Sequence, residues 1–373
     1  MDSTLRRFAL PLALLCFGLL AYCLVALAIS LWRSPHSPTL LIGAFYDEGI
    51  IVDKNPVKAA EWYLRAAEKG ETFAQFKTGF FYFFGRGVAV DHRKGLEWIT
   101  LSAEKGNSEA QFFLGDANYG GVEMPRDSAQ AAVWYRKAAQ QGHARAQQRL
   151  ADAYFRGIGV EQSDRKAFYW ARKASARGDA EGQTLLATFY FTGVGTPKNP
   201  QQGIQLLTQA AQSGNSEAYE WLGMANLNGI GTPKDVPAAI GWYTRAGDAG
   251  RAKAQYMLGY LYSSSGAVPA DYPTANRWLL KAATQGYAYA TATLAEHVDT
   301  GKGFEPNKLK ACGLVRVALN QKLSEYEDDL RGQLEHEEKA LSAEQLADVA
   351  ALEALYSTPQ GLGQLLGDIT SAP

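Results

Sequence analysis

The hydrophobic positions of this chain repeat with a period of 36 residues between about residues 39 and 322. In each period a small residue is followed by a large apolar residue three positions later, and by a second small residue four positions further on. Spacings of three and four place all three residues on one face of a helix, and we expect the tryptophans among them to be buried. The three columns are Ala59, Gly95, Ala131, Ala167, Gly203, Ala239, Ala275 and Ala311; Trp62, Trp98, Trp134, Trp170, Leu206, Trp242, Trp278 and Leu314; and Ala66, Ser102, Ala138, Ala174, Ala210, Ala246, Ala282 and Ala318.

Residues that begin and end helices keep the same period. Side chains suited to capping the first turn of a helix recur at Asn55, Asp91, Asp127, Ser163, Asn199, Asp235, Asp271 and Asn307. Glycines that can end a helix in the left-handed conformation recur at Gly70, Gly106, Gly142, Gly178, Gly214, Gly250 and Gly286. A second turn column holds Gly49, Gly85, Gly121, Gly157, Gly193, Gly229 and Gly301, with Ser265 as the exception. The preceding helix of each unit carries a leucine column that runs from Thr78 to Leu294. No alternating strand pattern occurs in the sequence. The sequence therefore predicts an all-α solenoid.

The repeating unit, for instance Ala146–Gly178, resembles the Sel1-like repeat, a relative of the tetratricopeptide repeat. The resemblance covers residues 39–322 in eight units, of which the first is partial and the eighth has lost its Trp and final Gly. It implies a right-handed superhelical solenoid of helix-turn-helix repeats that scaffolds or regulates protein complexes.

The N-terminus predicts a transmembrane helix. Residues 8–32 carry no charge, and about 20 apolar residues span a bilayer. Arg6 and Arg7 precede this run and only Arg33 follows it, which favours a cytoplasmic N-terminus. The predicted organisation is a cytoplasmic stub and anchor at 1–33, a linker at 34–38, and repeats on the periplasmic side of a bacterial inner membrane. The alternative is a signal peptide cleaved after Ala28.

Charge is distributed unevenly behind a formal net charge of −1. Residues 323–356 contain ten acids and two basic residues, and Asp368 adds one more negative charge, so residues 1–322 sum to +8. We expect 323–356 to form two capping helices with a solvated acidic face, and 357–373 to be a flexible tail. The balanced total disfavours a nucleic-acid binder.

Catalytic, metal-binding and cofactor-binding patterns are not found in the sequence. The five histidines are scattered, and Cys312 is expected to be a buried residue of a degenerate repeat. The recurring G-x-G pairs follow predicted helices rather than strands, so we interpret them as inter-helix turns and not as phosphate loops. These pairs are Gly85/Gly87, Gly157/Gly159, Gly193/Gly195 and Gly229/Gly231. Some Sel1-like proteins of pathogens are linked to penicillin binding and carry a cysteine pair in each repeat, and this chain lacks those pairs.

One column on the first helix of each unit predicts a partner-binding stripe, because it departs from the polar residues that the resemblance implies. This column begins at Asp47 and continues in steps of 36 residues through Phe83 to Asp299. It is apolar in the five central units and polar at both ends, where Asp47, Ser263 and Asp299 stand. Two interpretations remain open: an exposed binding stripe, or rings that fill the space between successive helix pairs. With neighbouring phenylalanines, the candidate residues are Phe76, Phe80, Phe83, Phe84, Phe112, Tyr119, Phe155, Phe191 and Leu227.

These observations predict a non-catalytic, membrane-anchored scaffold with a protein partner. The family resemblance adds a narrower candidate, an immunity protein that neutralises a secreted toxin, and the basic repeats would suit an acidic toxin. The competing classes are an enzyme, such as a cell-wall or penicillin-recognising protein, and a structural spacer without a partner.

Overall fold

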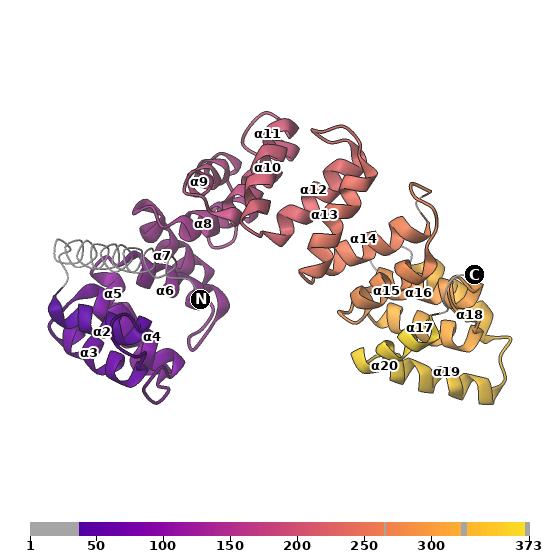
Figure 1. The fold of residues 1–373 in the computed structure, drawn as a ribbon, viewed down its shortest axis with the longest axis horizontal. Helices are drawn as coiled ribbons and strands as arrows, with labels where there is room; N and C mark the ends of the chain where they lie inside the picture. Colours follow the sequence, from indigo (N-terminus) through magenta and orange to yellow (C-terminus); the bar gives the residue numbers. More distant parts are fainter. Residues whose placement is uncertain (1–36, 265, 322–326, 370–373) are drawn as a thin grey trace, which may run out of the picture. The chain divides into compact units, whose positions relative to one another are not determined.

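The computed structural model describes residues 37–264, 266–321 and 327–369 and is helical throughout, apart from its turns (Figure 1). The all-α prediction is confirmed, since the only β-pairing among these residues is an isolated bridge between Phe304 and Ile369. The helices of the repeats are α2 (Pro38–Glu48), α3 (Pro56–Glu68), α4 (Thr72–Phe84), α5 (His92–Glu104), α6 (Ser108–Gly120), α7 (Ser128–Gln140), α8 (Ala144–Arg156), α9 (Asp164–Ala176), α10 (Ala180–Thr192), α11 (Pro200–Gln212), α12 (Ser216–Asn228), α13 (Val236–Asp248), α14 (Ala252–Ser263), α15 (Tyr272–Ala283), α16 (Ala288–Thr300) and α17 (Lys308–Asn320). They are followed by α18 (Glu327–Glu338), α19 (Ala343–Tyr356), α20 (Pro359–Gln364) and the 3₁₀ helix η1 (Leu365–Asp368).

The predicted membrane anchor at residues 8–32 lies outside the described residues. Among the helices of the described ranges, none combines the length and the apolar character that crossing a bilayer requires.

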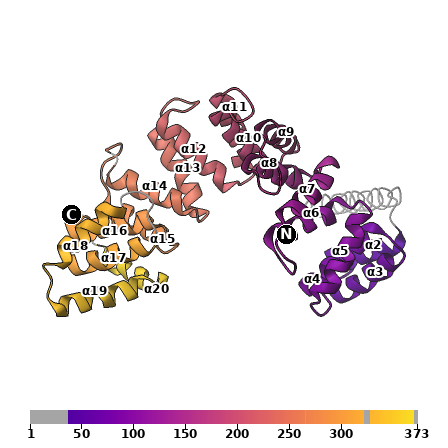
Figure 2. The same cartoon turned by 180° about the vertical axis from the view of Figure 1, so that it is seen from behind.

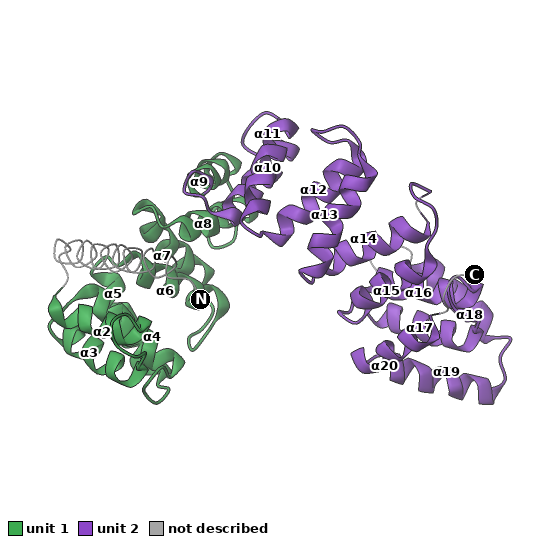
Figure 3. Ribbon diagram, in the orientation of Figure 1, with its two compact units in different colours: residues 1–174 green, residues 175–373 purple. Residues whose placement is uncertain are grey.

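The chain divides into two compact units (Figure 3), residues 1–174 and 175–373. In the first unit, helices α2 to α8 pack in chain order, each against the next. In the second unit, α10 to α17 do the same. Each unit is therefore built from neighbouring helices, as a repeat protein requires.

All eight predicted N-cap residues cap their helices. The side-chain oxygen accepts a hydrogen bond from the backbone N–H three residues later, for example at 2.9 Å from Ala238 to Asp235 and at 2.9 Å from Gln130 to Asp127. The remaining six pairs lie between 2.9 and 3.4 Å. These N-cap residues could be predicted from the sequence because each hydrogen bond joins two residues that are only three positions apart.

The core lies on the small-residue columns. The column of Ala59 and the column of Ala66 are buried in every repeat, as predicted. The expectation of a buried tryptophan column is wrong for most of its members, because only Trp134 is buried and the other five tryptophans are half-buried. In the first seven repeats the buried position stands one residue later, and apart from Ala171 it holds a bulky side chain: Tyr63, Ile99, Tyr135, Leu207, Tyr243 and Leu279. In the eighth repeat Leu314 itself is buried and Val315 is half-buried.

A buried glutamine column, not recognised in the sequence, ties consecutive repeats together. The side-chain amide of Gln111 in α6 donates to the carbonyl of Ala103 at the end of α5, at 2.9 Å. Gln75, Gln147 and Gln255 make the same bond to the residue eight positions earlier. These amides satisfy carbonyls that the end of the preceding helix leaves without an intrahelical partner.

The C-terminal end of the second unit is more ordered than the predicted tail. Both α18 and α19 pack on α17, and α20 packs on α15 and α19 (Figures 1 and 2). Residues 359–369 differ from the flexible segment that the sequence predicts, since Leu362 and Leu365 are buried in the last core cluster. Their apolar side chains stabilise a short helix that its glycines alone would disfavour.

Candidate protein-binding surfaces

The nine candidate residues fall into three environments. Phe83 and Phe112 are buried, so the packing interpretation applies to them. Phe84 and Tyr119 are exposed, with relative accessibilities of 55% and 38%. The other five are half-buried: Phe76, Phe80, Phe155, Phe191 and Leu227. The predicted column is therefore not a uniform surface within either unit.

Packing explains two of these positions directly. Phe191 stacks on Trp221 with ring centroids 6.0 Å apart, and its ring fills the space beside Gly203, where an added Cβ would lie 2.9 Å away. Phe112 stacks on His143 at 4.6 Å. In both cases the aromatic ring contacts a neighbouring helix or its cap.

Four of the candidate rings join a continuous aromatic run on the first unit. Phe76, Phe80 and Phe84 lie four residues apart along α4, which places them on one helix face. Their centroids are 6.2 and 4.5 Å apart, and Phe83 and Phe84 both contact Phe113 of α6, at 5.2 and 6.3 Å. We call the accessible part, Phe76, Phe80, Phe84 and Phe113, the phenylalanine face.

Two cations of the same unit are held by a buried carboxylate. Asp47 of α2 is fully buried and pairs with Lys77 of α4 at 3.2 Å and with Arg86 at 2.8 Å. The hydroxyl of Tyr63 donates to the same carboxylate at 3.2 Å, and burial together with the Asp47 charge raises the pKa of Tyr63. A buried charge is tolerated when it is paired in this way. The same ion pairs hold Lys77 over the ring of Phe73 at 5.8 Å and Arg86 over that of Phe81 at 5.3 Å.

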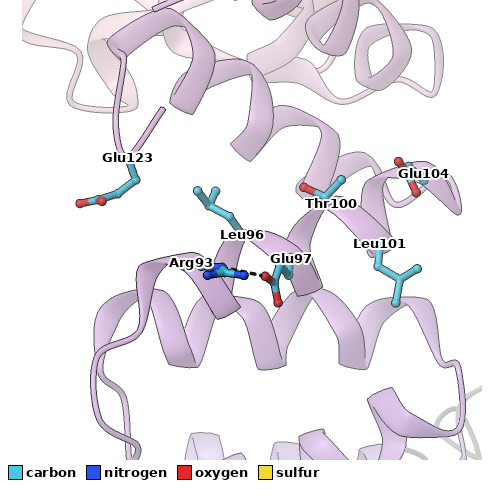
Figure 4. A pocket seen from close by; sticks show the side chains of 7 residues that line it. All are labelled: Arg93, Leu96, Glu97, Thr100, Leu101, Glu104 and Glu123. Atoms are coloured by element: carbon cyan, nitrogen blue, oxygen red, sulfur yellow. Dashed lines mark hydrogen bonds and ion pairs between the residues drawn. The ribbon is translucent and has the colours of Figure 1, made fainter. Parts of the chain in front are cut away.

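A groove of about 730 Å³ lies along α5 in the same unit (Figure 4). Leu96 and Leu101 provide its apolar part, and Glu97 and Glu104 lie on the same helix. Glu123 lines the groove from the loop after α6 (Figure 4), and its carboxylate lies 3.9 Å from Nε2 of His92. Three carboxylates against the single guanidinium of Arg93 make the lining acidic.

Glu123 stands where most repeats have a glycine. In five other repeats the equivalent position is the second glycine of a G-x-G turn, and in the remaining two it is Ile51 and Ala267. An added Cβ at Gly87 would lie 2.2 Å from the carbonyl oxygen of Pro56, and one at Gly159 would lie 1.9 Å from that of Ser128. In those repeats the turn therefore packs directly on the first residue of a preceding helix.

A side chain at position 123 excludes that close approach, and the carboxylate of Glu123 instead lies 3.9 Å from Nε2 of His92, the first residue of α5. Glu123 also has a φ of 56°, a left-handed conformation that costs energy for a residue other than glycine. The sequence carries this signal, because Gly-Val-Glu at 121–123 departs from the G-x-G that five of the eight repeats keep. We did not predict a site there, because the sequence does not show that position 123 and the side chains of α5 line one groove.

Contacts of the G-x-G turns support their interpretation as structural turns, because the second glycines Gly87, Gly159 and Gly231 abut backbone. Cys312 is fully buried, and burial raises the pKa of its thiol to about 12. Within the described ranges, no group of three His, Cys, Asp or Glu side chains is placed to hold a metal ion.

Paired helices joined by glycine turns and repeated every 36 residues define a helical repeat protein of the tetratricopeptide-related class. The Sel1 repeat model matches seven consecutive segments: 40–71, 72–107, 108–143, 144–179, 180–215, 216–250 and 252–287. The chain belongs to the Sel1 repeat family. Such proteins generally act as interaction scaffolds, so protein–protein interaction is the class of function that the repeats indicate.

Solved structures with the same architecture support this assignment. A Sel1 repeat protein from Oxalobacter formigenes is 36% identical over 69% of this chain and 75% of its own, with a TM-score of 0.57. The protective antigen c5321 of uropathogenic Escherichia coli, described as having an SLR fold, is 27% identical over 90% of this chain and 87% of its own, with a TM-score of 0.55. The immunity protein Pa5087 of Pseudomonas aeruginosa is 22% identical over 58% of this chain and 84% of its own, with a TM-score of 0.40. No curated protein matches the chain at a significant level.

Proposed function

We propose that this chain is a membrane-anchored, non-catalytic scaffold that binds a protein partner through the phenylalanine face. The observation that carries the proposal is Phe84, which is 55% exposed at the end of a run of contacting rings. Exposed aromatic side chains backed by other rings are typical anchors of protein interfaces, because they bury a large apolar area at low entropic cost.

The surroundings of the face indicate the chemistry of the partner. The half-buried rings of Phe76 and Phe80 provide a firm apolar support, and Lys77 adds positive charge beside Phe73, whose ring lies 6.5 Å from that of Phe76. A partner segment with an apolar side chain and acidic neighbours fits this combination.

A variant with a charge at the centre of this surface tests the proposal. Phe84→Asp should leave the circular dichroism spectrum unchanged, because the ring is largely in water, but should abolish binding. Val57→Asp is the matched control, since Val57 of α3 is 53% exposed and lies on another helix of the same unit. Full-length protein would be purified from membranes and its associated proteins compared by quantitative mass spectrometry.

The proposal stands if a protein is retained by the native chain and by Val57→Asp but lost from Phe84→Asp. It is wrong if Phe84→Asp, correctly folded, retains every protein that the native chain retains.

The anchor and the periplasmic location rest on the sequence of residues 1–33. The uncharged run 8–32 and the basic pair Arg6 and Arg7 support a single span with the repeats outside the cytoplasm. The full-length chain should then stay with membranes after an alkaline wash and be degraded by protease in spheroplasts. Release by the wash, with a mature N-terminus at Ile29, would instead identify a cleaved signal peptide.

A toxin-neutralising immunity protein is a narrower form of the same proposal. The charge of +8 on residues 1–322 supports an acidic toxin as the partner. Co-expression with a toxin encoded beside this chain should rescue growth for the native protein and fail for Phe84→Asp. An enzyme would instead be indicated by covalent labelling of a Ser or Cys with a penicillin probe, and a spacer by the absence of any retained protein.

A further inference from the structure

The groove along α5 shares two acids with its counterpart in the preceding repeat and differs at the other five lining positions, of which two bear on binding. Among the other three, Arg93 stands in place of Val57 and pairs with Glu97 at 3.2 Å. One period earlier, α3 carries Glu61 and Glu68 at the positions of Glu97 and Glu104. On α3, however, Arg65 stands between these acids and packs over the ring of Trp62 at 4.9 Å. On α5 its place is taken by Leu101, which is 37% exposed.

The second substitution is Glu123 in place of Gly87. Gly87 lets its turn lie against the first residue of α3, whereas Glu123 excludes so close an approach and adds a third carboxylate. An exposed leucine and the carboxylate of Glu123 therefore line the same groove of about 730 Å³, whose lining holds three carboxylates and one guanidinium.

We propose that this groove binds a basic amphipathic helix of a protein partner. Glu97 and Glu104 lie four residues before and three residues after Leu101, so all three share one face of α5. A partner helix that presents a leucine-type side chain with a Lys or Arg one turn away on either side matches this spacing. The carboxylate of Glu123 meets a further basic residue at the loop end of the groove.

This surface shares no residue with the phenylalanine face, although Leu96 packs on the same buried cluster as Phe76 and Phe113. The phenylalanine face is formed by rings of α4 and α6, whereas the groove lies along α5 and is acidic. The proposal therefore adds a second partner site that selects the opposite charge.

The test uses a fluorescent helical peptide of about 18 residues built from Leu and Lys. Its affinity for the full-length chain in non-ionic detergent would be measured by anisotropy, with empty micelles as the blank, at about 50 and 200 mM salt. Glu97→Lys with Glu104→Lys should weaken binding at least about tenfold, and salt should weaken binding to the native chain. The matched control, Glu61→Lys with Glu68→Lys, makes the same charge change on α3 and should alter the affinity less than about twofold.

Two further variants test the groove itself without reversing the charge of an acidic residue on α5. Glu123→Gly restores the glycine of most repeats and Leu101→Arg restores the cation of α3, and each should reduce peptide binding at least about fivefold while the protein remains folded. Phe84→Asp should leave peptide binding unchanged, so failure of this proposal and failure of the proposed function are distinguishable. Equal losses for the α3 and α5 charge variants, or full binding by Glu123→Gly, would show that the peptide senses only overall charge and would overturn the proposal.

Discussion

At the scale of single residues, neighbouring aromatic side chains have different roles in the same helix. Tyr243 of α13 is buried against Gly223, where an added Cβ would lie 2.8 Å from its ring. Trp242, one residue earlier, is half-buried between the ring of Tyr219 and the guanidinium of Arg245, which lies 4.7 Å from its centroid. The conspicuous tryptophans therefore cover the core, and the residues after them fill it.

This difference predicts unequal costs of truncation. Tyr243→Ala should lower the free energy of unfolding by about 3–5 kcal/mol, as expected for a buried aromatic ring. Trp242→Ala should cost about 1–2 kcal/mol, because only part of its area leaves water on folding. Urea denaturation of both variants measures the difference, and a larger loss for Trp242→Ala would contradict the assignment of the core.

A buried histidine in the last repeat gives the second unit a pH dependence. Asn276 donates to the carbonyl of Lys302 at 2.8 Å, which turns its amide oxygen toward Nδ1 of His297 at 2.6 Å. Because that oxygen only accepts hydrogen bonds, the neutral ring carries its proton on Nδ1. Nε2 is buried and has no hydrogen-bond partner among the described residues, and burial lowers the pKa of His297 to about 4.

Stability should consequently fall as the solution becomes acidic. The folded-state pKa lies below the value of 6.5 for an unperturbed histidine, so the unfolded chain binds more protons between these values. The contribution of His297 is complete above pH 6.5 and is lost toward pH 4, at about 1.4 kcal/mol per pH unit. The double variant His297→Leu with Asn276→Ile, which copies Leu261 and Ile240 of the previous repeat, should lose this slope in denaturation curves measured between pH 4 and 7. An unchanged slope would mean that other groups cause the acid sensitivity.

At the scale of helices, one arginine of the last repeat pairs with acids of both capping helices. Arg316 of α17 pairs with Glu338 at the end of α18 at 2.7 Å and with Glu353 of α19 at 3.3 Å. Asn320 of α17 also donates to Glu353 at 2.8 Å. Part of the acidic surface predicted to be solvated thus holds the capping helices in place.

Arg316→Met should loosen the cap while keeping the apolar stem of the side chain. The expected loss is about 1–2 kcal/mol in the local opening of α18 and α19, or roughly 5- to 30-fold faster amide hydrogen exchange there. Arg331→Met is the control, since Arg331 pairs only within α18, with Glu327 four residues earlier, and such exposed pairs contribute about 0.3–0.5 kcal/mol. Equal effects of the two variants on α19 would refute the role of Arg316.

At the scale of the whole molecule, we expect that a block of 36 residues, one full period, can be deleted without loss of the fold. Deleting residues 216–251 joins Asn215 to Ala252, so α14 begins after an N-cap asparagine and presents to α11 the same columns as α12. Repeat proteins are stabilised by contacts between neighbours, and the shortened chain should keep its helical ellipticity per residue and a cooperative transition. Deleting residues 216–233 places two second helices in succession and should abolish cooperative unfolding. Similar melting curves for the two deletions would show that the register of the columns is unimportant.

The sequence alone determined the repeat, its length, the helix pairs, their caps and the small-residue columns. These features depend on interactions between residues three or four apart, or on a pattern that is repeated seven or eight times. Local spacing and repetition can both be recognised in the sequence alone. Family membership follows from the same repetition.

Only the tertiary structure decided which of two adjacent aromatic residues is buried, that Phe83 is buried while Phe84 is exposed, and that Glu123 lines one groove with side chains of α5. Successive helical residues point about 100° apart, so the position of the neighbouring helix decides which of them it covers. The buried Asp47, the glutamine column and the pair of His297 and Asn276 depend likewise on partners that other helices supply. Their side chains are polar in the sequence, and only packing against another helix makes them part of the core.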